Sequence, residues 1–202
     1  MTALASRPKA PEGPLLRVEG LVAGHGASPA IGPLSFTIEP GEVIGLWGAN
    51  GAGKSTLLDA LVGTAHRFAG TLVRRPGLTL AYQEQQPARL PLMPMTGLDL
   101  LRAAGVLDPP PSLRLRAWLG QRLDTLSGGE FQLLHVWATL GSGMDLILLD
   151  EPTNNLDPGA ETLVGEFLAK PRGGQAVLLV SHERDFLDRV CHRVVEVLAW
   201  KG

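Results

Sequence analysis

Apolar residues fall into two repeating patterns along most of the chain. Continuous apolar runs of strand length occupy 42–47, 145–150 and 176–180, and such runs are typical of strands that a parallel sheet buries on both faces. Apolar residues at helical spacing occupy 55–62 and 131–140, between these runs. Strands that alternate with helices in this way predict βαβ units, and therefore an α/β fold around a parallel sheet.

The pattern continues towards the C-terminus. Pro158 suits the first turn of a helix, where a missing N–H costs nothing, and this helix is predicted to extend to Lys170. Residues 183–188 predict a short helix, and 194–198 predict a final strand. The C-terminal third therefore completes the same α/β core.

A β-region is predicted to precede and border the first helix. Alternating apolar residues bounded by turn residues indicate short strands. We expect the two strands before the first helix to form an N-terminal antiparallel region, and two further short strands to follow that helix. The Ala- and Pro-rich segment before them lacks periodicity and predicts a disordered tail. The tail occupies 1–14, the strands 15–21, 33–38, 70–73 and 78–82, and a turn-rich loop 23–29.

The amino-acid composition changes at 87–126, where the chain is rich in Leu, Pro and Arg. Thr96 is positioned to cap a helix that ends before Gly105, with Asp99 at the capping-box position. Ser112 can cap a second short helix that extends to Leu119. We therefore predict one domain over 15–202, with a short helical subdomain inserted in its core.

Composition bounds the function. The chain has 202 residues, 45% of them apolar, and a formal net charge of −2, so no broad affinity for nucleic acid is expected. The only cysteine, Cys191, cannot form an intrachain disulfide, and we expect it to be a buried core thiol. No run of about 18 apolar residues is present, which predicts no transmembrane segment, no signal peptide and a cytoplasmic location.

A phosphate-binding loop lies between the first core strand and its helix. The segment from Gly48 to Thr56 reads Gly-Ala-Asn-Gly-Ala-Gly-Lys-Ser-Thr. Its glycines let backbone N–H groups converge on phosphates, and the following helix N-terminus adds partial positive charge. The lysine adds a point charge for the β/γ-phosphates, and the serine hydroxyl suits Mg²⁺. The predicted nucleotide ligands are Gly48, Asn50, Gly51, Gly53, Lys54, Ser55 and Thr56.

Two acids, Asp150 and Glu151, end the second apolar run. Ligands of α/β sheets bind at the carboxyl ends of the strands. In a phosphate-loop protein the first acid can hold Mg²⁺, and the second can polarise the attacking water. Adjacent acids at a strand end also occur by accident, so this pair becomes informative only together with further motifs.

Four further segments, together with the phosphate loop, resemble the ABC-type ATPase domain over nearly the whole chain. They read Leu-Ser-Gly-Gly-Glu at 126–130, Leu-Ile-Leu-Leu-Asp-Glu-Pro-Thr at 146–153, Asn-Leu-Asp at 155–157 and Val-Ser-His at 180–182. In the order of that family they match the signature motif, the Walker B strand, the D-loop and the switch histidine. The resemblance implies a P-loop NTPase fold with a RecA-like parallel sheet, and ATP with Mg²⁺ as cofactors.

The resemblance also implies roles for individual residues. Ser127, Gly128 and Gly129 would contact ATP held by a second ABC ATPase subunit, and Asp157 would communicate across that dimer. Glu151 matches the general base, and His182 the histidine that senses the γ-phosphate. Gln85 best matches the glutamine that contacts Mg²⁺ and the attacking water, with Gln83 and Gln86 as competitors. Ser55, Gln85 and Asp150 are the predicted metal ligands.

The chain departs from the family pattern at three positions. His25 stands where an aromatic residue, usually tyrosine, stacks on adenine, and imidazole offers less stacking area. Leu133 and Ala138 occupy positions where arginines are common in the helix after the signature. These departures leave nucleotide binding expected but put the details of the dimer interface and the turnover rate in question.

Two functions of different classes are consistent with these motifs. A chain of this size without a membrane span most resembles the ATP-binding subunit of a bacterial transporter, whose partners are a membrane permease and a second ATPase subunit. The segments 89–92, 98–101 and 126–130 are similar to zinc/manganese importer ATPases, which suggests divalent metal uptake at the membrane surface. The segments 151–157 and 180–188 instead resemble soluble ABC proteins that act on ribosomes.

Overall fold

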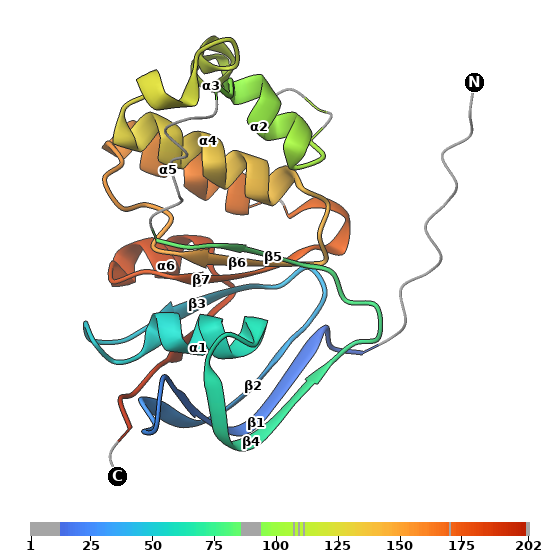
Figure 1. The fold of residues 1–202 in the computed structure, drawn as a ribbon, viewed down its shortest axis with the longest axis vertical. Coiled ribbons are helices and arrows are strands. Elements are labelled where there is room, and N and C mark those ends of the chain that lie inside the picture. The colour runs from blue at the N-terminus through green and yellow to red at the C-terminus, as the bar shows by residue number, and fades with distance from the viewer. Residues whose placement is uncertain are drawn as a thin grey trace.

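The computed structural model describes residues 13–85, 94–106, 108, 110, 112–169 and 171–200. Within these ranges the chain forms two sheets, with helices on either side of the larger sheet (Figure 1). The predicted tail up to residue 12, Gln86, the 89–92 segment and Lys170 lie outside the described residues. That 15–202 forms one domain with a helical insertion stays a prediction.

The larger sheet is parallel and has the strand order β5-β6-β7-β3-β8. Its strands β3, β6 and β7 are almost entirely buried, as the continuous apolar runs predicted, and shorter strands lie at its edges. This confirms the predicted P-loop NTPase class of α/β fold. The strands are β3 (Val43–Trp47), β5 (Leu80–Gln83), β6 (Leu146–Asp150), β7 (Ala176–Val180) and β8 (Arg193–Glu196).

Alternate residues of the parallel strands face two separate hydrophobic layers. In β6, Ile147 and Leu149 pack with the helices α4 (Gly128–Gly141) and α5 (Pro158–Leu168). Leu146 and Leu148 face the opposite layer, which contains α1 (Lys54–Val62) and the antiparallel sheet. Because side chains alternate along a strand, the four apolar residues of β6 supply two residues to each of the two hydrophobic cores.

The smaller sheet is antiparallel, as predicted, with the order β2-β1-β4. All three strands are longer than expected. The largest extensions are in β1 (Leu16–Gly24), which continues into the predicted loop, and in β4 (His66–Arg74), which begins four residues before the predicted strand. The extensions pair with each other, because Val22 to Gly24 register with residues 66–69. The third strand is β2 (Ile31–Ile38).

The helical lobe packs against α4 and contains α2 (Gly97–Ala103), α3 (Leu113–Trp118) and the 3₁₀ turn η1 (Leu123–Thr125) (Figure 1). Thr96 and Asp99 form the predicted capping box of α2. Ser112 occupies the N-cap of α3, but its hydroxyl makes no capping hydrogen bond. Apolar residues of the lobe, among them Leu101, Leu115 and Trp118, share one hydrophobic core with residues of α4.

The C-terminal part contains α5, the 3₁₀ turn η2 (Arg172–Gly174) and α6 (Arg184–Val190). Cys191, expected to be a buried core thiol, is only partly buried at the end of α6, although that burial raises the thiol pKa to about 12. Over the ranges that the structure covers, every helix is too short or too polar to cross a membrane.

Candidate active site

The phosphate loop connects β3 to α1 and depends on glycine at two close approaches. Gly53 has a φ of +88°, and a Cβ there would lie 2.0 Å from Cγ2 of Ile31. A Cβ on Gly48 would lie 2.4 Å from the carbonyl oxygen of Val197. Because no L side chain fits either place, the loop backbone lies directly against its neighbours.

Lys54 is buried within the loop that it serves. Its Nζ donates hydrogen bonds to the carbonyl oxygens of Gly48 at 2.8 Å and Ala49 at 3.1 Å, and the residue is only 7% exposed. A buried ammonium needs such acceptors to offset lost hydration. The contacts hold the positive charge at the wall of the cavity.

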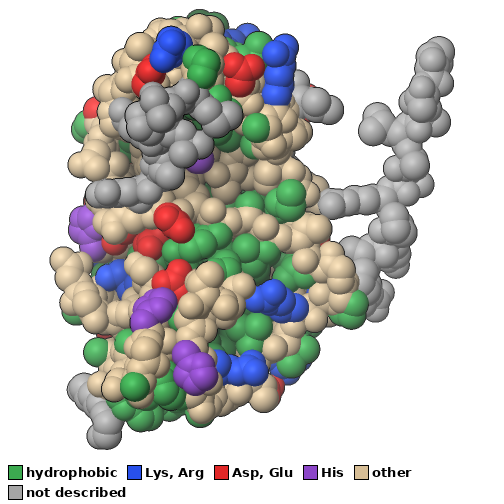
Figure 2. All heavy atoms as spheres, in the orientation of Figure 1, with side chains coloured by type: hydrophobic (Ala, Val, Ile, Leu, Met, Phe, Trp, Pro, Cys, Tyr) green, Lys and Arg blue, Asp and Glu red, His purple; other side chains and the backbone are tan. Residues whose placement is uncertain are grey.

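An open cavity of about 580 Å³ lies beside the loop, within the size range of small-ligand sites. Figure 2 shows acidic, basic and histidine side chains gathered near mid-height on one face of the molecule. The cavity therefore combines a phosphate loop, an acid pair and a histidine. Its lining residues are Ala30, Asn50, Gly51, Gly53, Lys54, Ser55, Thr56, Gln85, Asp150, Glu151, Asn154, Val180 and His182.

Asp150 is a buried carboxylate at the end of β6. The residue is 3% exposed, and its Oδ1 has no hydrogen-bond partner within the described part of the chain. Burial raises the pKa of this carboxyl, the hydrogen bond from Ser55 opposes that rise, and the nearby negative charge of Glu151 adds to it. An unpaired buried acceptor beside a hydroxyl suits a hard cation that binds oxygen ligands.

Glu151 is held by both its backbone and its side chain. Its φ of +48° is unusual for a residue other than glycine, and its N–H donates to the carbonyl oxygen of Val180 at 3.0 Å. Its carboxylate accepts a hydrogen bond of 2.8 Å from Nδ1 of His182. The ends of β6 and β7 therefore place a carboxylate and an imidazole together at the cavity.

The glutamine candidates occupy different environments. Gln85 is exposed and lines the cavity. Gln83 lies inside β5 and is 4% exposed, and its amide has no partner among the described residues. Of the two, only Gln85 lines the cavity.

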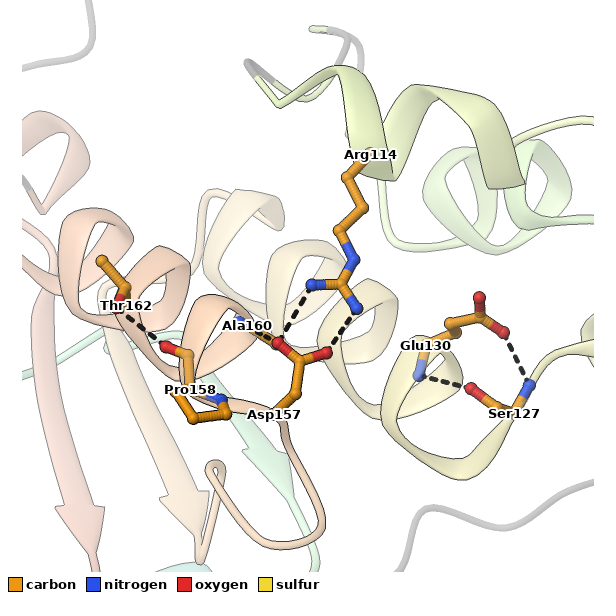
Figure 3. A network of polar contacts seen from close by, with 7 residues as sticks. All are labelled: Arg114, Ser127, Glu130, Asp157, Pro158, Ala160 and Thr162. Carbon is orange, nitrogen blue, oxygen red and sulfur yellow. Dashed lines mark hydrogen bonds and ion pairs between the residues drawn. The ribbon is translucent and has the colours of Figure 1, made fainter.

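The signature residues lie outside the cavity lining. Ser127, which precedes α4, accepts a hydrogen bond from the N–H of Glu130, and the Glu130 carboxylate accepts one from the N–H of Ser127 (Figure 3). Gly128 and Gly129 form the first turn of the same helix. Asp157 caps α5 and is likewise absent from the residues that line the cavity.

His25 is also absent from the residues that line the cavity. Its Nε2 lies 3.0 Å from Oδ2 of Asp59 on α1, and its side chain is more than half exposed. Tyr82 donates a long hydrogen bond of 3.5 Å to the other oxygen of Asp59. No local sequence pattern indicates this cluster, because its members come from three separate parts of the chain.

Burial explains why apolar residues stand at the two positions where arginines are common in the family. Leu133 and Ala138 are 0% and 2% exposed, and both belong to the core beneath the helical lobe. A guanidinium at either position would be buried without water. Asn154 and Ala30, which line the cavity, were not singled out from the sequence.

Comparison with known proteins agrees with this geometry. Residues 31–154 match the family model described as ABC transporter. The chain is 36% identical over 193 residues to the zinc import ATP-binding protein ZnuC of Paracoccus denitrificans (strain Pd 1222), covering 90% of this chain and 75% of that protein. It is 33% identical over 189 residues to the ZnuC protein of Jannaschia sp. (strain CCS1), covering 90% and 78%.

A solved structure described as the ATP binding subunit of an ABC transporter superposes with a TM-score of 0.78. The two chains are 25% identical, and the match covers 91% of this chain and 86% of that one. None of these similar proteins favours the ribosome-acting alternative. From its phosphate loop, its acid pair and these likenesses, the chain belongs to the ABC transporter family, as an ATP-binding protein that hydrolyses ATP.

Proposed function

We propose that this protein is the ATP-hydrolysing subunit of a divalent metal importer, which it drives through a separate membrane permease. The observation that carries the proposal is the assembly of Lys54, Asp150, Glu151 and His182 around one cavity. Relatives named as zinc import proteins, at 33% and 36% identity, support the choice of cargo.

The phosphate loop would bind the β- and γ-phosphates of ATP. Backbone N–H groups around Gly51 and Gly53 and the N-terminus of α1 supply partial positive charge, and Lys54 supplies a full charge. Because the lysine is held by loop carbonyls, it needs little reorganisation when phosphate arrives.

The residues beside the loop fit Mg²⁺. The unpaired Oδ1 of Asp150 and the adjacent hydroxyl of Ser55 are hard oxygen ligands, and Gln85 lines the same cavity. We propose that these three residues hold the ion, directly or through water. When bound, Mg²⁺ would neutralise charge on the phosphate oxygens.

Glu151 would act as the general base. Its carboxylate accepts the proton of a water that attacks the γ-phosphate in line, while the leaving group is ADP. His182 fixes the carboxylate through its Nδ1, and its ring is half exposed, which leaves it able to contact the γ-phosphate. The pair thus provides both orientation and proton transfer.

A second ABC ATPase subunit would complete each site. Ser127, Gly128 and Asp157 are exposed and lie away from the cavity lining of their own chain. The N-terminus of α4 offers N–H groups and partial positive charge to an anion brought by another chain. We propose that two such subunits bind ATP between them at the cytoplasmic face of the membrane, and that His25 contacts the base.

Metal uptake is tested by deleting the gene in the native organism and measuring the cellular content of divalent metals under zinc limitation. The deletion should lower zinc or manganese, and the wild-type gene should restore it. Glu151→Gln should fail to restore it, whereas Glu196→Gln, the same change on the exposed end of β8, should succeed. Unchanged contents of all divalent metals in the deletion strain would refute the proposed cargo.

A further inference from the structure

One ion pair joins the helical lobe to the loop that follows the acid pair. Arg114 in α3 and Asp157 before α5 are 43 residues apart in sequence. Nη1 of the arginine donates to Oδ1 at 3.1 Å, and Nη2 donates to Oδ2 at 2.5 Å (Figure 3). This fork-to-fork geometry fixes the orientation of both planar groups.

Asp157 is held from its other side as well. Its Oδ1 also accepts the N–H of Ala160 at 2.9 Å, which caps α5. The hydrogen bond from Arg114 is the largest cause that lowers the pKa of Asp157 to about 2, and the bond from Ala160 is the next. The carboxylate is therefore charged at neutral pH and positioned by two elements at once.

The segment between Glu151 and Asp157 is short and tightly folded. The N–H of Asn154 donates to the carbonyl oxygen of Glu151, and the N–H of Leu156 donates to that of Thr153, both at 3.1 Å. Asn155 has a φ of +61°. Because these hydrogen bonds leave the segment few free backbone torsions, a displacement of Asp157 at one end should also displace Glu151 at the other.

The first turn of α4 packs directly on this segment. A Cβ on Gly129 would lie 3.0 Å from the carbonyl oxygen of Asn155, so the helix and the turn are in close contact. Arg114 belongs to α3, which packs on this same helix. The guanidinium therefore lies where three parts of the chain meet. These are the helical lobe, the signature helix (α4, which begins with the signature residues) and the loop after Glu151.

The pair is too exposed to serve mainly as a stabilising contact. The side chains of Arg114 and Asp157 are 42% and 52% exposed, and exposed ion pairs contribute little to folding stability. Arg122 and Asp124 form a similar bidentate pair with exposures of 53% and 38%, but both belong to the lobe itself. Of these two pairs, only Arg114–Asp157 connects the helical lobe with the segment 151–157.

We propose that Arg114 is a positioning residue for ATP hydrolysis. Through Asp157 it holds the segment 151–157 in register with the helical lobe and the signature helix. The backbone of Glu151 at the start of this segment then keeps its carboxylate at the cavity. Arg114 does not line the cavity, so it acts on the catalytic step and not on ATP binding.

The test is steady-state ATP hydrolysis by the full chain, with ATP affinity measured separately. Arg114→Ala should lower kcat by about tenfold while the Kd for ATP stays within about twofold, since small misplacements of catalytic groups cost rate and not binding. Arg114→Lys, which keeps the charge without the fork, should give an intermediate kcat. The matched control Arg122→Ala should retain the wild-type kcat.

A double-mutant cycle shows whether the effect passes through Asp157. Asp157→Asn keeps a capping acceptor for α5 but removes the charge. In that background Arg114→Ala should have no further effect on kcat. The proposal is overturned if Arg114→Ala retains the wild-type kcat or fails to fold, if Arg122→Ala loses as much, or if the loss persists undiminished beside Asp157→Asn.

Discussion

Replacement of Asp150 by asparagine should make the nucleotide-free protein more stable while impairing its use of Mg²⁺. Asp150 is 3% exposed, and its Oδ1 has no partner among the described residues. Burial raises its pKa, and the charges of Glu151 and Asp59 raise it further. Asparagine keeps the shape and an acceptor for Ser55 but removes the buried charge.

The expected gain follows from the cost of an unpaired buried acceptor, which is about 1–3 kcal/mol. Because asparagine leaves part of this cost in place, we expect a gain of about 1 kcal/mol at neutral pH. For a chain of this length that corresponds to a rise in Tm of about 2–4 °C. The carboxyl has a raised folded-state pKa, so its contribution to stability is present below its unfolded pKa and lost as pH rises through the folded value. The advantage of asparagine should therefore shrink in acid.

Thermal unfolding measured with and without ATP and Mg²⁺ tests both parts. In wild type, saturating ligand at 100 times its Kd adds about 2.7 kcal/mol, and the part that depends on Mg²⁺ should be lost in Asp150→Asn. Asp145→Asn is the matched control beside the start of the same strand, because Asp145 already accepts hydrogen bonds from Thr79 and should gain no stability. A Tm for nucleotide-free Asp150→Asn at or below the wild-type value would refute this reasoning.

Two further substitutions test the loop and the base. Glu151→Gln should lower hydrolysis by at least about 100-fold, keep ATP affinity and trap a dimer; a variant that stays monomeric with ATP and Mg²⁺ in gel filtration would count against the dimer. Gly53→Ala should lose ATP binding in calorimetric titration, because the new Cβ would meet Ile31. The control Gly26→Ala has a similar φ of +70° but open space around its Cβ, and it should bind ATP normally. Equal ATP affinities of the two variants would show that the loop tolerates a side chain.

Much of the fold was predictable because local pattern and long-range packing agree in the parallel sheet. The strands β3, β6 and β7 are buried on both faces, so their apolar runs are continuous and their bounds are clear. The strand β4 was predicted too short, since most of its residues are exposed and carry little apolar signal. Its length is set by pairing with β1, where Gly70 and Gly20 approach closely at a bulge.

The candidate site likewise contains residues that local sequence could place and contacts that it could not. Lys54, Asp150, Glu151 and His182 follow the ends of neighbouring parallel strands, so their motifs are sufficient to place them around one cavity. The contact of His25 with Asp59 depends on how the antiparallel sheet lies against α1, which no local pattern encodes.

The Arg114–Asp157 pair is a further case that sequence reasoning missed. An arginine in a lobe rich in Leu, Pro and Arg carries no distinguishing signal. Its partner was identified only by resemblance, as an aspartate that follows the acid pair. The contact exists only in the folded chain, where Arg114 of α3 reaches Asp157 at the N-cap of α5 (Figure 3).

Co-purification from native membranes and cytosol tests most directly whether this ATPase drives a transporter. The tagged Glu151→Gln variant, held with ATP and Mg²⁺, would be isolated and its partners identified by mass spectrometry. We predict recovery of a polytopic membrane protein together with a second ABC ATPase subunit. Recovery of ribosomes without any membrane protein would contradict a transport function and support the soluble class.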